Sequence, residues 1–156
     1  MCFDLSVYDI FGALSAGAKL VMVSEPKDIR QVAKTVIEKE ITIWNSVPAF
    51  VQMYVSELQR EAKKNRECNT KERYQENLLR LCIMSGDWIL VSLPKELRKE
   101  LPEIEIVSMG GATEASIWSI YYPIGTVKNS GTVYHMADLW QIRICICLSG
   151  TENSAQ

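Results

Sequence analysis

Apolar positions along this chain fall into two alternating patterns. Short apolar runs predict four buried strands, at residues 19–23, 41–45, 78–84 and 103–109. Apolar residues at helical spacing predict helices at residues 5–16, 28–40, 49–64 and 91–101. Alternating strands and helices are typical of βαβ units. The pattern therefore predicts an α/β fold, with a mostly parallel sheet flanked by helices.

Polar or glycine-containing segments follow three of the predicted strands. They are residues 45–48, 85–88 and 110–114. In parallel sheets the carboxyl ends of the strands gather at one edge, and ligands bind there. We therefore expect these three segments to converge on one binding edge.

Composition narrows the class of protein. With 156 residues and 47% hydrophobic content, the chain is long enough for one domain with a core. A net charge of -2 gives no basic field, so neither nucleic acid nor an anionic membrane is an expected partner. Five cysteines and one histidine match no zinc frame, which favours reduced thiols. Lys19 interrupts the apolar stretch 10–23, so no membrane span is expected and the location is predicted to be cytoplasmic.

The segment from Gly110 to Glu114 carries candidate chemistry. Its two glycines allow close approach of a ligand to the backbone. The hydroxyl of Thr113 can donate to a phosphate oxygen, and the carboxylate of Glu114 is a suitable oxygen ligand for Mg²⁺. Taken alone, the same residues also suit a plain strand-to-helix turn with an N-cap.

Four motifs in this order resemble a known family. They are FDLSVYDIFGALSAG, ITIWNSVPAF, LCIMSGDWI and SMGGATEASIWSIYYP, which together run from about Phe3 to Ile124. The chain resembles the amino-acid adenylation domains of nonribosomal peptide synthetases, which belong to the AMP-binding, adenylate-forming superfamily. The resemblance implies an internal fragment of the large N-terminal subdomain of such a ligase.

The resemblance also implies an activity with its cofactors and partners. Family members use ATP and Mg²⁺ to convert an amino acid into an aminoacyl adenylate. They then load the acyl group onto the phosphopantetheine thiol of a carrier protein. Heterocyclisation or condensation domains of the synthetase are the implied neighbours.

By this resemblance, residues of the glycine-containing loop bind and activate the nucleotide. Gly110, Gly111, Ala112 and Thr113 match nucleotide-binding positions, Thr113 and Glu114 match catalytic positions, and Glu114 matches the Mg²⁺ ligand. Asp4 matches the residue that pairs with the substrate's α-ammonium group. An N-cap for the helix beginning at Leu5 is the alternative interpretation of Asp4.

The resemblance places nine side chains around the amino acid: Asp4, Leu5, Tyr8, Asn45, Ile83, Ser85, Met109, Ile117 and Trp118. In this order they resemble the pocket of cysteine-activating domains. Bulky side chains narrow the pocket while Asn45 and Ser85 supply polar contacts, so serine is the competing substrate. Taken singly, Ile83, Met109, Ile117 and Trp118 fit ordinary core packing better, and only the ordered set of nine favours a pocket.

The family pattern stops near Ile124, which predicts a partial adenylation domain at 1–127 and a poorly ordered, non-family tail at 128–156. Back-translating residues 133–143 and reading from the third codon position gives IPYGRPLANQ with permitted codons, a segment this family carries after its Thr-Glu loop. We interpret the tail as frameshifted, so His135, Cys145 and Cys147 hold no metal or redox site.

Motifs expected upstream and downstream are absent from the sequence, so the chain alone is expected to be inactive. The alternative is a nucleotide- or amino-acid-binding module that complements a partner chain in a split synthetase.

Overall fold

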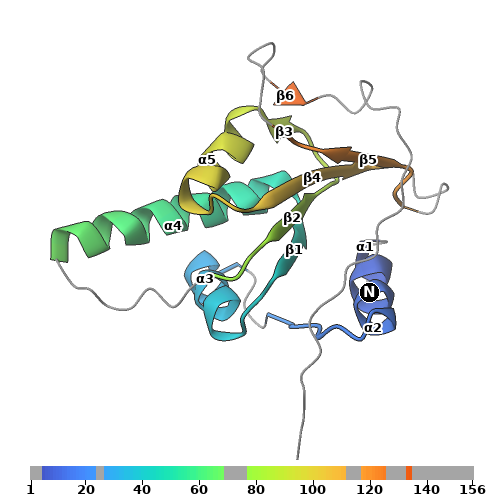
Figure 1. The fold of residues 1–156 in the computed structure, drawn as a ribbon, viewed down its shortest axis with the longest axis horizontal. Coiled ribbons are helices and arrows are strands. Elements are labelled where there is room, and N and C mark those ends of the chain that lie inside the picture. The colour runs from blue at the N-terminus through green and yellow to red at the C-terminus, as the bar shows by residue number, and fades with distance from the viewer. Residues whose placement is uncertain (1–4, 24–26, 69–76, 112–116, 126–132, 135–156) are drawn as a thin grey trace, which may run out of the picture.

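A four-stranded sheet in the order β1-β2-β4-β5 forms the centre of the protein (Figure 1). The computed structural model describes residues 5–23, 27–68, 77–111, 117–125 and 133–134. The strands of this sheet are β1 (Ile43–Ser46), β2 (Leu81–Met84), β4 (Glu105–Gly110) and β5 (Ile120–Pro123). The first three run parallel and β5 is antiparallel to β4, so the predicted, mostly parallel α/β sheet is confirmed.

Helices lie on both faces of the sheet (Figure 1). On one face lie α3 (Ile29–Glu38), α4 (Pro48–Cys68) and α5 (Ser92–Glu100). The N-terminal helical segment lies on the other face and comprises α1 (Leu5–Val7), the π-helical turn η1 (Tyr8–Gly12) and α2 (Ala13–Ser15). All four predicted helices are present, and α4 runs beyond its predicted end at residue 64. Within the described residues, none of the helices combines the length and apolarity that crossing a membrane requires.

The main core lies between the sheet and the helices α3, α4 and α5. Trp44, Cys82, Met84 and Ile106 point from alternate strand positions into this core, and Leu97 meets them from α5. The Trp44 ring packs against Tyr54 of α4 with ring centroids 4.5 Å apart. Burial of each large aliphatic side chain contributes about 1.5–3 kcal/mol, so this face supplies most of the stability.

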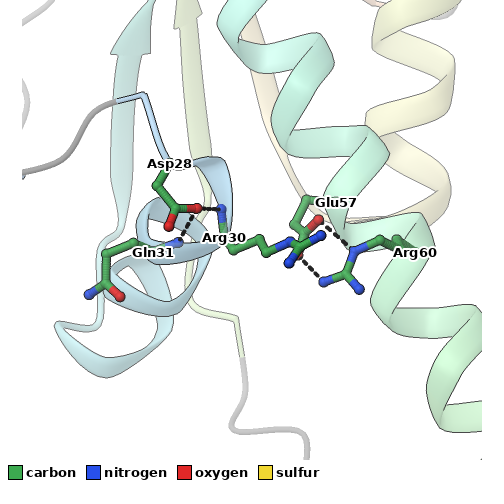
Figure 2. A network of polar contacts seen from close by, with 5 residues as sticks. All are labelled: Asp28, Arg30, Gln31, Glu57 and Arg60. Atoms are coloured by element: carbon green, nitrogen blue, oxygen red, sulfur yellow. Dashed lines mark hydrogen bonds and ion pairs between the residues drawn. The ribbon is translucent and has the colours of Figure 1, made fainter.

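Polar contacts fix the start of α3, and a second set lies on the neighbouring helix α4 (Figure 2). The Asp28 carboxylate accepts hydrogen bonds from the backbone amides of Arg30 and Gln31, at 3.0 and 3.3 Å, and so caps the helix. On α4, Arg60 donates through two nitrogens to the two carboxylate oxygens of the buried Glu57. Figure 2 shows the Arg30 side chain extending from α3 toward Glu57.

One strand prediction was wrong. Residues 18–23 form neither strand nor helix, although Gly17 ends the preceding helix at φ 67° as expected. A strand exists only where its backbone groups find a partner, and among the described strands β1 pairs only with β2. Met22 is 87% exposed, so this apolar run is not buried as its composition suggested.

Three strands were not predicted. β5 pairs with β4, and β3 (Ile89–Leu90) pairs with β6 (Val133–Tyr134) in a separate antiparallel sheet. β3 and β6 have two residues each, which is too few to show a periodic pattern in the sequence, and only their pairing defines them as strands.

Candidate functional site

The carboxyl ends of β1, β2 and β4 meet at one edge of the sheet. These strands are parallel neighbours, and the backbone amide of Ser85, just after β2, donates to the carbonyl oxygen of Ser46 at 3.3 Å. Gly110 is the last residue of β4 at the same edge. The predicted convergence of the three strand exits is therefore confirmed for the described residues.

Four predicted substrate residues share the sheet face opposite the main core. Asn45 is in register with Ile83, which is in register with Val107 of β4. Because side chains alternate along a strand, Ser85 and Met109 lie on the same face, two positions beyond Ile83 and Val107. Ile83 and Val107 are 4% and 5% exposed but lie outside the main core cluster. This face is therefore a second buried surface, separate from the core.

The N-terminal helical segment covers this second face. From η1, Asp9 accepts a hydrogen bond from Asn45 Nδ2, with 2.7 Å between the Asp9 Oδ1 and Asn45 Nδ2 atoms. The preceding residue, Tyr8, packs its ring against Trp118, with centroids 4.6 Å apart and an interplanar angle of 59°. Single π-helical turns are frequent at functional sites, and here one carries both contacts.

Three buried side-chain polar atoms in the described part of the chain have no hydrogen-bond partner. They are Asn45 Oδ1, Ser85 Oγ and Trp118 Nε1. All three belong to the nine predicted substrate residues, and Ser85 is only 2% exposed. Native proteins rarely leave buried polar groups unpaired, because each costs about 1–3 kcal/mol. The arrangement suits a ligand that supplies hydrogen-bond donors and acceptors of its own.

Asp9 is a site residue that the sequence did not reveal. Burial raises the pKa of its carboxyl group, and the hydrogen bond from Asn45 opposes that shift. The signal in the sequence is an acidic residue inside the apolar segment SVYDIFGAL. Such a residue also fits an exposed helix face, and only the contact with β1 distinguishes the two interpretations.

A cavity of about 840 Å³ lies beside this face, along the free edge of β1. Tyr8, Asp9 and Asn45 line it, together with residues 17–21, Val23 and parts of α3. Ile83, Ser85 and Met109 do not contribute to its lining. The cavity therefore overlaps the predicted substrate site only at one end. An open sheet edge produces a large cavity without any ligand, so the unpaired polar atoms indicate a ligand more directly than the cavity does.

At Gly111 the glycine-containing loop lies very close to the backbone of residues 117–119. A Cβ atom on Gly111 would lie 2.7 Å from both the carbonyl oxygen of Ile117 and the amide nitrogen of Ser119. Ile117 has φ 74°, an unfavourable value for a β-branched residue. Gly111 is therefore required by the loop's own backbone, whether or not a ligand approaches it.

Several predicted site residues lie outside the described residues: Asp4, Ala112, Thr113 and Glu114, together with the side chain of Leu5. Their predicted roles remain predictions. Among the side chains that are described, no three potential metal ligands cluster together.

The fold and the site define a class of protein: an α/β domain that binds a ligand at the carboxyl ends of its parallel strands. The chain belongs to a family described as AMP-binding enzyme, whose model matches residues 1–146. Within that family it corresponds to part of an adenylation domain of the nonribosomal peptide synthetase type, as its relatives indicate.

The relatives are large proteins. The chain is 46% identical over 132 residues to bacitracin synthase 1 of Bacillus licheniformis, covering 82% of this chain and 2% of the relative. It is 41% identical over 126 residues to the pyochelin synthetase PchF of Pseudomonas aeruginosa, covering 80% of this chain and 6% of that protein. The chain thus spans a small part of the curated relatives it matches.

A solved structure shows the same fold. The nonribosomal peptide synthetase FmoA3, in its α-methyl-L-serine-AMP bound form, superposes with a TM-score of 0.61 and 34% identity. The match covers 81% of this chain and 14% of FmoA3.

Proposed function

We propose that this chain forms the amino-acid-binding part of an adenylation domain that activates a small polar amino acid, cysteine first. The observation that carries the proposal is the set of unpaired polar atoms on Asn45, Ser85 and Trp118. A substrate side chain with one polar atom, held between these groups, would satisfy them. A larger apolar side chain would leave them unpaired.

Bulky side chains support a small substrate. Tyr8 and Trp118 pack against one another, and Ile83 and Met109 lie on the covered face of the sheet, so these four side chains would narrow the proposed pocket. Cysteine and serine both fit this description, and the order of the nine residues resembles that of cysteine-activating domains. FmoA3 has a structure with an α-methyl-L-serine adenylate bound, which supports a small polar substrate here.

In the proposed reaction, Asp4 binds the substrate's α-ammonium group. Thr113 donates a hydrogen bond to the nucleotide phosphate, and Glu114 holds Mg²⁺ beside it. When bound, Mg²⁺ stabilises negative charge on the phosphate oxygens. The products are an aminoacyl adenylate and pyrophosphate, and the acyl group then passes to a carrier-protein thiol.

Amino-acid binding by the chain tests this proposal. The indole N–H of Trp118 gives a separate signal in a ¹H–¹⁵N spectrum, which is assigned by its loss in Trp118→Phe. We expect titration with cysteine to shift this signal more than titration with alanine or leucine, with serine second. The Trp44 indole serves as an internal control, because its Nε1 already donates to Ser46 Oγ at 2.7 Å.

Two results would count against the proposal. The first is a Trp118 signal that leucine shifts as strongly as cysteine does. The second is a Trp118 signal that no amino acid shifts.

The nucleotide part is tested separately by adding ATP with Mg²⁺, for which we expect shifts in the backbone amides of Gly110 and Gly111. The variant Glu114→Gln should reduce those shifts and leave the response to cysteine intact.

A further inference from the structure

The hydrogen bond between Asp9 and Asn45 constrains a side chain of the amino-acid site. Asn45 lies on β1 and Asp9 on η1, so the contact connects the sheet with the helical segment that covers it. The donor is Asn45 Nδ2 and the acceptor is Asp9 Oδ1, 2.7 Å apart. Asp9 is half-buried at this point, which strengthens a charge-assisted hydrogen bond.

Chemistry fixes the direction in which the Asn45 carboxamide points. An ionised carboxylate only accepts hydrogen bonds, so the NH₂ end of the amide must face Asp9. The carbonyl end, Oδ1, must then face away from Asp9. That atom is buried and has no hydrogen-bond partner among the residues that the structure describes. Asp9 therefore determines that Asn45 presents an acceptor, and not a donor, to its other side.

We propose that Asp9 is a positioning residue that holds Asn45 Oδ1 toward the amino-acid pocket, so that the pocket selects side chains that donate a hydrogen bond. This inference rests on the proposed function, since it concerns the same pocket. Asp9 is not among the nine residues that the family resemblance assigns to the substrate.

The selected class of substrate follows from the acceptor. A thiol or hydroxyl group can donate to Asn45 Oδ1, and it can accept from the Trp118 N–H or the Ser85 hydroxyl, the other two unpaired groups. A methyl group of the same size can do neither. 2-Aminobutyrate, which carries a methyl group where cysteine has its thiol, is therefore the discriminating probe. We expect it to bind about tenfold more weakly than cysteine, which is the usual effect of one lost hydrogen bond.

The test compares dissociation constants for cysteine and 2-aminobutyrate, measured on the whole chain from the Trp118 indole signal. In Asp9→Leu the Asn45 carboxamide loses its hydrogen-bond acceptor. We therefore expect the roughly tenfold preference for cysteine over 2-aminobutyrate to fall to about twofold or less. Asp9→Asn, which can accept or donate, should give an intermediate preference. Asp9→Glu keeps the carboxylate and should restore much of it. Glu103→Gln removes one exposed carboxylate elsewhere and should leave the preference unchanged.

A second measurement does not depend on any ligand. The side-chain NH₂ signals of Asn45, assigned by their loss in Asn45→Asp, should move in Asp9→Asn and Asp9→Leu and stay in place in Glu103→Gln. If Asp9→Leu does not fold, the isosteric variant Asp9→Asn tests the role of Asp9, both by the ratio of the two dissociation constants and by the Asn45 NH₂ signals.

The outcomes separate the two proposals. A wild-type protein that binds 2-aminobutyrate as tightly as cysteine overturns the role of Asp9 and leaves amino-acid binding in place. That role is also overturned if Asp9→Leu keeps the full preference for cysteine over 2-aminobutyrate. It is overturned as well if the Asn45 NH₂ signals move in neither Asp9→Asn nor Asp9→Leu. If no amino acid shifts the Trp118 signal, the proposed function fails together with the selection of substrate. The Asn45 signals then still report whether Asp9 orients the amide.

Discussion

The rings of Tyr8 and Trp118 pack against each other at a centroid distance of 4.6 Å and an angle of 59°. One ring comes from the N-terminal helical segment and the other from the segment between β4 and β5. Tilted aromatic pairs of this kind stabilise a structure beyond the area that they bury. The pair therefore links two parts of the chain that are far apart in sequence and that both contribute to the proposed pocket.

A double-mutant cycle with Tyr8→Leu and Trp118→Leu measures this link. We expect a coupling free energy of about 0.5–1.5 kcal/mol, obtained from urea unfolding of the wild type, both single variants and the double variant. A pair of distant aromatic residues, Tyr8 and Tyr54, should show no coupling in the same cycle. Additive effects of Tyr8→Leu and Trp118→Leu would mean that the ring contact does not stabilise the protein in solution.

Gly111 should not tolerate a side chain. In Gly111→Ala the new methyl group would lie 2.7 Å from the Ile117 carbonyl oxygen and the Ser119 amide nitrogen, so the loop must shift. We expect a loss of about 1–3 kcal/mol in the free energy of unfolding, as for other overpacked sites. Gly125→Ala is the matched control, because its new methyl group would meet no atom of the described residues within 4 Å beyond its immediate chain neighbours. Equal stability of the two variants would contradict this prediction.

Much of the sheet could be predicted from the sequence. Strands β1, β2 and β4 are short apolar runs because a parallel sheet is covered on both faces, and the helices between them have one apolar side. Residues 19–23 have the same composition but form no strand, since strand formation depends on a partner as well as on apolarity. β3 and β6 are too short to leave a pattern in the sequence.

The sequence predicted part of the candidate site and missed one of its residues. Asn45, Ile83, Ser85 and Met109 follow from the strand exits and the family resemblance, and the structure places all four on one face. Asp9 could not be found in this way, because its importance comes from a single hydrogen bond to a strand distant in sequence. No local pattern encodes such a contact.

The ion pair between Glu57 and Arg60 should make stability depend on pH. The hydrogen bonds from Arg60 hold the pKa of the Glu57 carboxyl group below its ordinary value, against the opposing effect of burial. A group with a lowered pKa stabilises the folded state above its unfolded pKa, and this contribution is lost as the pH falls through the folded pKa. We therefore expect the destabilisation caused by Glu57→Gln to be largest at neutral pH and to shrink in acid.

Urea unfolding of wild type and Glu57→Gln across the acidic range checks this prediction. Glu38→Gln is the matched control, because Glu38 pairs with Lys34 at 3.5 Å on the surface, with both side chains at least half exposed. Exposed pairs contribute little, so Glu38→Gln should change stability by less than about 0.5 kcal/mol at any pH. A Glu57→Gln effect that does not vary with pH would argue against the ion pair.

We propose that a single-base frameshift separates the family sequence from residues 133–143. Met136-Ala137 and Trp140-Gln141 force glycine and alanine in the shifted frame, as the family segment requires. The family model's match extends to residue 146, so comparison at the protein level does not locate the slip. Sequencing the gene across codons 124–132 should reveal an inserted or deleted base whose correction restores IPYGRPLANQ. A region that cannot be restored by one base would end this interpretation.

Cys82 should be unreactive in the folded protein. It lies on β2, 1% exposed, and burial raises the pKa of its thiol to about 12. Only the thiolate reacts readily with alkylating agents, and a thiol with this pKa is almost entirely protonated at neutral or mildly alkaline pH. Alkylation followed by peptide mass spectrometry should label Cys82 only when denaturant unfolds the protein. Its labelling should follow the same denaturant midpoint as the unfolding transition, because the thiol is exposed only when the core opens. Rapid labelling of Cys82 without denaturant would show that β2 opens locally, and that the face carrying Ile83 is less firmly held than its burial indicates.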